Sequence, residues 1–258
     1  HAAGDVLWFV DSDVIAWGDG AQKVRAAFAD PEVGAVFGSY DDAPDGQHWF
    51  SRYKNLMHRF YHQTARKDAA TFWAGCGAVR AEVFRRIGGF DVETYRVPSI
   101  EDIELGYRIR RAGSRIVLDP TLLGKHLKVW TPKGALHTDI FRRALPWSRL
   151  MIAREGVAND LNTSQAERLK AVLAGLLILS VLALPFALGL WWLPVALAAA
   201  ALALNWRLFA FLRGNGGVWF AVRALAWHQF YYVYSAAAFV WCLFEFHVLG
   251  RKNRLHVP

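Results

Sequence analysis

The first 150 positions alternate between short apolar runs and segments in which apolar residues recur with helical spacing. Residues 6–10 are continuously apolar, which is typical of a strand covered on both faces of a largely parallel sheet. The same criteria predict helices at residues 21–29, 49–66, 81–87 and 100–112 and strands at 35–38, 71–79 and 115–118. This order predicts an α/β domain with a mostly parallel sheet and flanking helices.

A long apolar region follows this domain. Residues 171–206 are 36 consecutive positions without a charged side chain. As one helix they would measure about 54 Å, whereas the hydrocarbon core of a membrane is about 30 Å thick. Pro185, Gly189 and Pro194 mark a turn, so we expect two membrane-spanning helices, at 171–188 and 191–211. The alternative is a buried helical hairpin of a soluble protein.

A third uncharged stretch, residues 224–244, is long enough to span, although His228 and Gln229 make its start polar and favour an interfacial location. Residues 139–151 combine aromatic and basic side chains, as expected of a helix at a membrane interface or of an ordinary packed surface helix. The predicted organisation is therefore a catalytic domain at 1–150, a linker or interfacial segment at 151–170, and a transmembrane region of two or three helices at 171–258.

Charge placement predicts the orientation of the hairpin. Its ends are basic and its tip carries no charge, which places the α/β domain in the cytoplasm of a plasma or inner membrane. The basic residues at the ends are Arg154, Arg168, Lys170, Arg207 and Arg213. A third full crossing would move Arg251 and its basic neighbours to the opposite side, against this rule, and the sequence leaves that question open.

Composition narrows the partners. The formal charge is +8, but the basic residues cluster beside apolar segments, which favours membrane lipids over nucleic acid. Cys76 and Cys242 are the only cysteines, so neither a disulfide framework nor a zinc site is predicted. The nearly charge-free spans provide no polar pathway, which argues against a channel or transporter.

Two acidic pairs are the candidate chemistry. Asp11 and Asp13 follow the first predicted strand, and if the chain stays extended both carboxylates point to the same side and can hold a hard cation. A solvated turn is the alternative. Glu101 and Asp102 open a predicted helix, where Ser99 to Asp102 is also a passable capping box.

Several motifs occur in a specific order around these pairs. After Asp11-Ser12-Asp13 come Trp73-Ala74-Gly75-Cys76-Gly77-Ala78-Val79-Arg80, then Ile87-Gly88-Gly89-Phe90-Asp91, then Glu101-Asp102. Over roughly residues 4–150 this succession resembles the family 2 glycosyltransferases of the type-A fold. The resemblance implies a partial type-A domain, a nucleotide-sugar donor, Mg²⁺ or Mn²⁺ held at Asp11 and Asp13, Asp102 as the catalytic base, and inversion at the anomeric centre.

The resemblance also implies substrate contacts. It assigns the small-residue loop to the acceptor and offers His126 to the metal or diphosphate, with an isolated interfacial histidine as the alternative. Trp73 and Trp130 are candidates for stacking on sugars or for packing, and Arg80 for neutralising a phosphate or for a surface position. Arg143 and Trp147 stand where processive synthases carry Q-x-x-R-W, and this departure favours transfer of a single sugar. The full set of substrate-binding candidates is Trp73, Gly75, Cys76, Gly77, Arg80, Glu101, Trp130, Arg143 and Trp147.

The part of the type-A fold that holds the nucleotide base is expected ahead of His1, so we expect this fragment alone to be inactive. The sequence predicts transfer from a nucleotide-diphosphate sugar to a hydroxyl of a lipid or lipid-linked glycan at the cytoplasmic face. One alternative is a polyprenyl-phosphate acceptor, which has little need of a base. Another is a catalytically inactive membrane scaffold.

Overall fold

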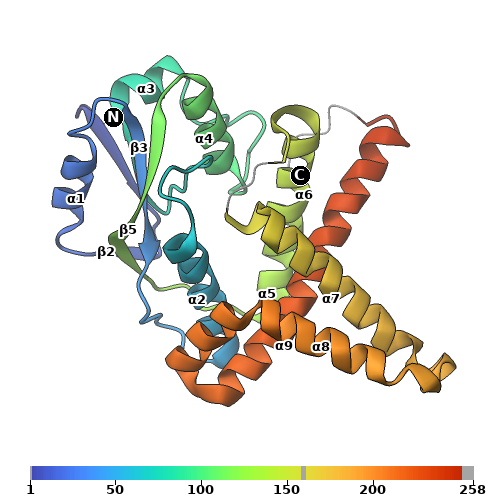
Figure 1. Cartoon of the computed structure of the whole chain (residues 1–258). Helices are drawn as coiled ribbons and strands as arrows, with labels where there is room; N and C mark the ends of the chain where they lie inside the picture. The colour runs from blue at the N-terminus through green and yellow to red at the C-terminus, as the bar shows by residue number, and fades with distance from the viewer. Residues whose placement is uncertain (1, 158–160, 252–258) are drawn as a thin grey trace.

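The computed structural model describes residues 2–157 and 161–251. A five-stranded sheet with helices on both faces forms the first part, and a group of helices with a projecting hairpin forms the last (Figure 1). The strands are β1 (Val6–Val10), β2 (Val14–Ala16), β3 (Val33–Tyr40), β4 (Cys76–Arg80) and β5 (Arg115–His126).

The helices of the first part are α1 (Gly20–Ala27), α2 (Trp49–Thr64), α3 (Ala81–Arg86) and α4 (Glu101–Arg111). One helical run then contains α5 (Pro132–His137), the π-helical η1 (Thr138–Ala144), α6 (Leu145–Leu150) and the π-helical η2 (Met151–Glu155). After the short 3₁₀ turn η3 (Leu161–Thr163), the last part contains α7 (Gln165–Ala183), the 3₁₀ turns η4 (Leu184–Phe186) and η5 (Leu188–Leu190), α8 (Trp192–Leu204) and α9 (Trp206–His247).

The sheet is mixed, and the prediction of a mostly parallel sheet was wrong. The strand order is β1-β4-β3-β5-β2, and β3 with β5 is the parallel pair, whereas β1 with β4, β3 with β4 and β2 with β5 are antiparallel. The prediction rested on the apolar run that forms β1, but β1 is an edge strand and is only half-buried. The strand buried along its whole length is β3, in the middle of the sheet.

Alternation along β3 fills both faces of the sheet. Ala35 and Phe37 pack with Leu105 and Ile109 of α4, while Val36 packs with Val24 of α1 on the other side. The sheet is therefore covered on both sides, as the alternating pattern of strands and helices predicts. Its lower end in Figure 1, where β2 and β5 are labelled, lies on the side of α2 and the C-terminal helices.

Residues 139–151 pack on the domain. Asp139, Pro146 and Leu150 are buried, whereas Phe141 is exposed. Of the two interpretations that the sequence left open for this segment, the structure favours the packed helix.

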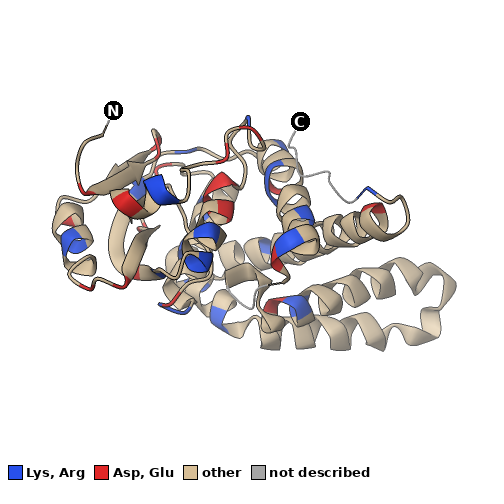
Figure 2. Cartoon of the chain, turned by 90° about the horizontal axis from the view of Figure 1, so that it is seen from above, with Lys and Arg blue, Asp and Glu red and all other residues tan. Residues whose placement is uncertain are grey.

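The hairpin of α7 and α8 projects from the rest of the molecule, and Figure 2 shows no charged residue along its projecting part. One helical segment, Gln165–Phe186, is long and apolar enough to cross a membrane, and only 11% of its most apolar window is buried. The pair Leu188–Leu204 and Trp206–His247, bent by 74°, passes the same test only when taken together. Length and composition alone support these assignments.

Helix α9 is docked along the first part of the protein. A break at Gly217, with φ of 80°, divides it. Beyond the break, one face contacts α2 and the run from η1 to α6 through His228, Tyr234, Cys242 and Glu245. His228 on this face is one of the two polar residues that left open, in the sequence, whether residues 224–244 span a membrane.

Candidate functional site

The acidic pair Asp11 and Asp13 lies in a tight turn after β1. The Val14 N–H donates to the Asp11 carbonyl over 3.0 Å, so the chain does not stay extended as the sequence interpretation assumed. The turn nevertheless keeps the two carboxylates close enough to interact. Desolvation, followed by the charges of Asp13 and Glu101, raises the pKa of Asp11, while Lys128 and Arg143 lower it.

Pairing of β2 with β5 brings His126 to this turn. Val14 is the register partner of His126, and the Leu127 N–H donates to the Asp13 carbonyl over 2.8 Å. His126 Nε2 lies 3.6 Å from Asp13 Oδ1. Burial lowers the pKa of His126 to about 4, although Asp13 acts in the opposite direction. The neutral ring is therefore the form present near neutral pH.

Asn55 of α2 determines which nitrogen of His126 carries the proton. Its amide nitrogen donates to the Lys128 carbonyl over 3.3 Å, so its carbonyl oxygen faces His126 Nδ1 and accepts. Nδ1 is then the protonated nitrogen, and Nε2 presents a lone pair toward the Asp13 carboxylate. Two acceptors facing each other at 3.6 Å fit a cation or a bridging donor between them.

The predicted three-ligand metal site is not assembled. Within residues 2–157 and 161–251, no group of three or more His, Cys, Asp or Glu side chains is arranged to hold a metal ion. Asp13 and His126 are together, whereas Asp11 interacts with Asp13 only through its charge. Mg²⁺ is commonly bound by one or two carboxylates together with substrate phosphates, and the Asp13 carboxylate is of this kind.

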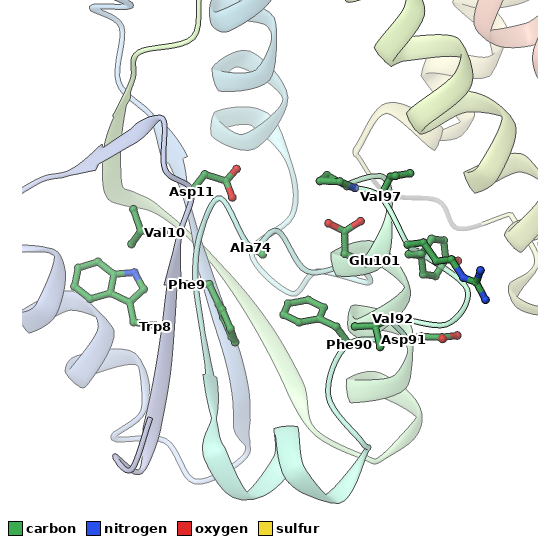
Figure 3. A pocket seen from close by; sticks show the side chains of 13 residues that line it. Trp8, Phe9, Val10, Asp11, Ala74, Phe90, Asp91, Val92, Val97 and Glu101 are labelled. Carbon is green, nitrogen blue, oxygen red and sulfur yellow. The ribbon is translucent and has the colours of Figure 1, made fainter. Parts of the chain in front are cut away.

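The second acidic pair lies across a cavity from the first. A cavity of about 550 Å³ has Asp11 on one wall and Glu101 on the other, with Ala74 between them (Figure 3). Its other lining residues are mostly apolar: Trp8, Phe9, Val10, Phe90, Asp91, Val92, Tyr95, Arg96, Val97 and Pro98. The Asp11 and Glu101 carboxylates thus line opposite walls of one mostly apolar cavity.

Glu101 makes the bond to the helix start that a capping box would give to Asp102. Glu101 accepts the Ser99 N–H over 2.6 Å and so ties back to the helix start. Asp102 accepts the Ala74 N–H over 3.1 Å and the N–H of its neighbour Ile103 over 2.8 Å. Asp102 therefore contacts the small-residue loop, whose Gly75 carbonyl in turn accepts the Asp11 N–H over 3.1 Å.

The electrostatics of Asp102 suit proton transfer. Burial and then the charge of Glu101 raise its pKa to about 7, although two backbone N–H groups and Arg143 act in the opposite direction. A base with a pKa near the working pH combines a useful ionised fraction with proton affinity. Asp102 is not among the residues that line the cavity itself, whereas Glu101 is.

The small-residue loop is closely packed. A Cβ on Gly75 would lie 2.4 Å from the Trp73 ring, and one on Gly77 would lie 2.3 Å from the Trp73 carbonyl. Cys76 between them is fully buried, and burial raises the pKa of its thiol. These residues shape the backbone that Asp102 and Asp11 bind, so their contribution to the site is made through the main chain.

Three predicted substrate contacts have packing roles. The Trp73 ring makes edge-on contacts with the rings of Tyr40 and His62 and a tilted contact with that of His58. Trp130 is buried with Lys54 and Lys128 over its ring. Trp147 donates to the Tyr107 hydroxyl over 3.2 Å and packs against α4.

Arg80 lies away from the site. It pairs with Val6, at the opposite end of β1 from Asp11, and donates to three backbone carbonyls, those of Phe28, Asp30 and Val33. The structure therefore does not support Arg80 as a phosphate contact, because its guanidinium is engaged in holding neighbouring loops.

Two cations face the acidic turn. Arg143 of η1 acts on the pKa values of Asp11 and Asp102, and its side chain is 45% exposed. Lys128, which the sequence interpretation missed, has its Nζ 3.9 Å from Asp13 Oδ2 and a side chain that is 47% exposed. In the sequence, only its position two residues after His126 indicated that Lys128 could lie near the acidic turn. Both cations are available to an anionic group bound at the turn.

The comparisons with known proteins concern the family and the fold. The model of the family described as glycosyltransferase like family 2 matches residues 1–149. Among solved structures, the chain is similar to the mannosyltransferase PcManGT from Pyrobaculum calidifontis in complex with GDP-Man and Mn²⁺. The TM-score is 0.54 at 21% sequence identity, over 93% of this chain and 64% of that one. The comparison with curated proteins gave no match.

Proposed function

Because the chain belongs to the glycosyltransferase-like family 2, we propose that the complete protein transfers a sugar from a nucleotide-diphosphate donor to a hydroxyl of a lipid or lipid-linked glycan. The observation that carries this proposal is the link between the acidic elements: Asp102 binds the Ala74 N–H, and the adjacent Gly75 carbonyl binds the Asp11 N–H. One loop thus joins a candidate base to the acidic turn that faces Lys128 and Arg143. The likeness to PcManGT supports the fold, and this chain spans 64% of its length.

In the proposed reaction, the acceptor oxygen attacks the anomeric carbon as the bond from that carbon to the diphosphate breaks. The acceptor proton passes to Asp102, and single displacement inverts the anomeric centre. Lys128 and Arg143 bind the departing diphosphate. A Mg²⁺ or Mn²⁺ ion held by Asp13 and His126, with the charge of Asp11 nearby, would add positive charge at the same leaving group.

We place the domain on the cytoplasmic face of a membrane, with the α7–α8 hairpin in the lipid. Most large apolar side chains of this hairpin are exposed, including Leu179, Leu182 and Phe186, at 63%, 64% and 92%. A core helix of a soluble protein would bury these side chains. An apolar hairpin in the same chain as the site favours an acceptor that is itself anchored in lipid.

The experiment that tests the function is turnover by the complete protein in liposomes, across nucleotide-sugar donors and lipid acceptors, with and without a divalent cation. Cation-dependent transfer supports the proposal. Nucleotide-sugar binding without turnover across the whole panel contradicts it and favours the inactive scaffold.

Replacing Asn55 tests the cation site without touching a proposed ligand. Asn55→Leu removes the acceptor that keeps the proton of His126 on Nδ1. Loss of such an outer partner lowers metal affinity by about 10- to 100-fold, so we expect half-maximal activation to need that much more Mn²⁺. Asn215→Leu is the control, since the Asn215 side chain donates to the Phe211 carbonyl within its own helix and not to His126. An unchanged Mn²⁺ requirement in Asn55→Leu contradicts the assignment of His126.

Replacing Lys128 tests the diphosphate contact. Hydrogen bonds to charged groups contribute about 1.5–3 kcal/mol, so Lys128→Met should lower kcat/KM for the donor by roughly 10- to 100-fold. Lys125→Met is the matched control, because Lys125 Nζ pairs with Asp45 at 3.2 Å rather than with the acidic turn. Equal effects of the two substitutions on kcat/KM would show that Lys128 has no specific contact with the donor.

A further inference from the structure

The α7–α8 hairpin has a fixed base. Glu167 of α7 and Asn205, which follows α8, both accept the hydroxyl of Tyr232 in α9, over 2.7 and 3.1 Å. Glu167 also accepts the Tyr61 hydroxyl of α2 over 2.8 Å and pairs with Lys170 at 2.6 Å. This buried polar cluster holds both legs against the first part of the protein, so the reach of the hairpin beyond it is set by helix length.

Both legs are short. The uncharged part of α7, residues 171–183, and the whole of α8 each contain 13 residues, or about 20 Å of helix. A further 3₁₀ turn at the tip adds about 6 Å. The total of about 26 Å is below the hydrocarbon thickness of about 30 Å, and any tilt reduces the depth further. The segment Gln165–Phe186 reaches the length of a span only when its charged first turn, which forms the base cluster, is counted.

The tip is built for an apolar environment. It carries no charged residue, and its large side chains Phe186, Leu188 and Trp191 are 92%, 74% and 65% exposed. Three of its backbone N–H groups are bonded within the tip: those of Ala187, Leu190 and Trp191 donate to the carbonyls of Leu184, Ala187 and Leu188. Pro185 has no N–H to satisfy. Backbone groups within the hydrocarbon must find partners in the protein, and the turns supply partners for these three groups.

Helix α9 contacts α7 at the base of the hairpin and is also held against the first part of the protein. Arg149 of α6 pairs with Glu245 near its end at 3.0 Å, and Tyr234 binds Asp139 of η1 over 2.7 Å. Its opposite face carries exposed apolar side chains, including Trp219, Val240 and Trp241. These contacts hold α9 on the side of the catalytic domain along the residues that make them.

We propose that the α7–α8 hairpin is re-entrant: it enters the lipid from the side of the catalytic domain, ends inside the hydrocarbon and returns without crossing. The partner is the acyl region of the bilayer. This inference rests on the membrane location proposed above. The sequence analysis expected two membrane-spanning helices here, whereas a re-entrant hairpin does not cross the membrane. Residues on either side of the hairpin, including α9 and Arg251, then lie on the side of the catalytic domain.

Cysteine labelling in sealed vesicles tests this topology. Gly189→Cys places a thiol at the tip and Gly18→Cys places one in the catalytic domain, and a Cβ at either glycine meets no atom within 4 Å. The natural Cys76 and Cys242 are buried, so the parent protein gives the background signal. The probe is a membrane-impermeant maleimide applied to right-side-out and inside-out vesicles.

We expect Gly18→Cys to label in one vesicle orientation only, and Gly189→Cys to label in neither until detergent is added. Labelling of Gly189→Cys from the face opposite Gly18→Cys would establish a full crossing and overturn the proposal. Labelling from the same face without detergent would overturn it too, by placing the hairpin outside the lipid. Phe186→Cys repeats the test at the most exposed position of the tip, should Gly189→Cys fail to reach the membrane.

A tag added after Pro258 gives an independent readout. We expect external protease to remove it in the vesicle orientation in which Gly18→Cys labels, whereas removal in the other orientation contradicts the proposal. Neither measurement uses turnover, so failure of the topology leaves the proposed transferase intact, and failure of the transferase assay leaves the topology result standing.

Discussion

Asp102→Asn is expected to lower turnover of the complete enzyme by about 10² to 10⁴-fold, the usual contribution of a general base. Asparagine keeps the size of the side chain and can still accept one of the two backbone N–H groups that bind Asp102, but it cannot take up the acceptor proton. Steady-state kinetics with saturating donor measure the effect. Asp68→Asn is the control, because Asp68 is an exposed carboxylate paired with Arg110.

The pH dependence provides a second readout of the same group. The pKa of Asp102 is raised from 3.8 to about 7, so the carboxyl is protonated and inactive as a base at lower pH. We expect turnover of the parent enzyme to fall as the pH drops through about 7 and this limb to be missing from the residual activity of Asp102→Asn. A parent profile that is flat between pH 6 and 8, as approximate limits around this pKa, would contradict the assignment.

Asp102→Asn should affect the free energy of unfolding differently from turnover. Because folding raises the pKa of Asp102, the folded state favours the protonated carboxyl, and ionisation lowers the free energy of unfolding as pH rises from about 4 to about 7. Asparagine removes this penalty above pH 7, so the activity loss is not expected to come with a large fall in melting temperature. If turnover instead survives the substitution nearly intact, the acceptor is already ionised, and the polyprenyl-phosphate alternative becomes the better account.

The sequence predicted local elements better than their pairing. Helices at 49–66, 81–87 and 100–112 match α2, α3 and α4 within two residues at each end, because apolar spacing and stop signals such as Gly88 are local. Strand direction is not local: the apolar run of β1 suits an edge strand of a mixed sheet as well as a central parallel one. The three-residue β2 escaped prediction, although it is the strand that brings His126 to Asp13.

The candidate site shows the same division. The order of motifs identified the family, and the family match over residues 1–149 confirms that resemblance. What the sequence lacked was geometry: Asn55 of α2 determines the tautomer of His126, and Lys128 gains its role only because Asp13 is folded back beside it. Conversely, Arg80 has the right chemistry for a phosphate contact and lies at the wrong end of its strand.

The C-terminal helices are attached through an ion pair whose two residues are far apart in the sequence, so the sequence alone does not predict it. Lys54 of α2 is buried, and its ammonium binds both oxygens of Asp139 in η1, which also accepts the Tyr234 hydroxyl of α9 over 2.7 Å. Burial lowers the pKa of Lys54, and Asp139 opposes that change. This cluster joins α2, the run that carries Arg143, and α9, so it fixes the helical part relative to the site.

Asp139→Asn should therefore destabilise the protein strongly. It leaves the buried Lys54 ammonium without its counterion, a change that typically costs about 3–5 kcal/mol. At about 2–4 °C per kcal/mol for a protein of this size, the melting temperature is expected to fall by about 6–20 °C. Tryptophan fluorescence of the detergent-solubilised protein during heating measures this, and Asp68→Asn, which breaks the exposed pair with Arg110, should change it little.

The double substitution of Lys54→Met with Asp139→Leu separates charge burial from packing. Replacing a buried ion pair by apolar side chains of similar volume is often neutral or stabilising, so the double variant should regain most of the lost melting temperature. A double variant no more stable than Asp139→Asn would show that the Tyr234 contact, rather than the unpaired ammonium, carries the effect. Because Arg143 lies one helical turn from Asp139, with its guanidinium 3.9 Å from the Asp139 carboxylate, a recovered fold with weakened donor binding would show that the same cluster also positions the site.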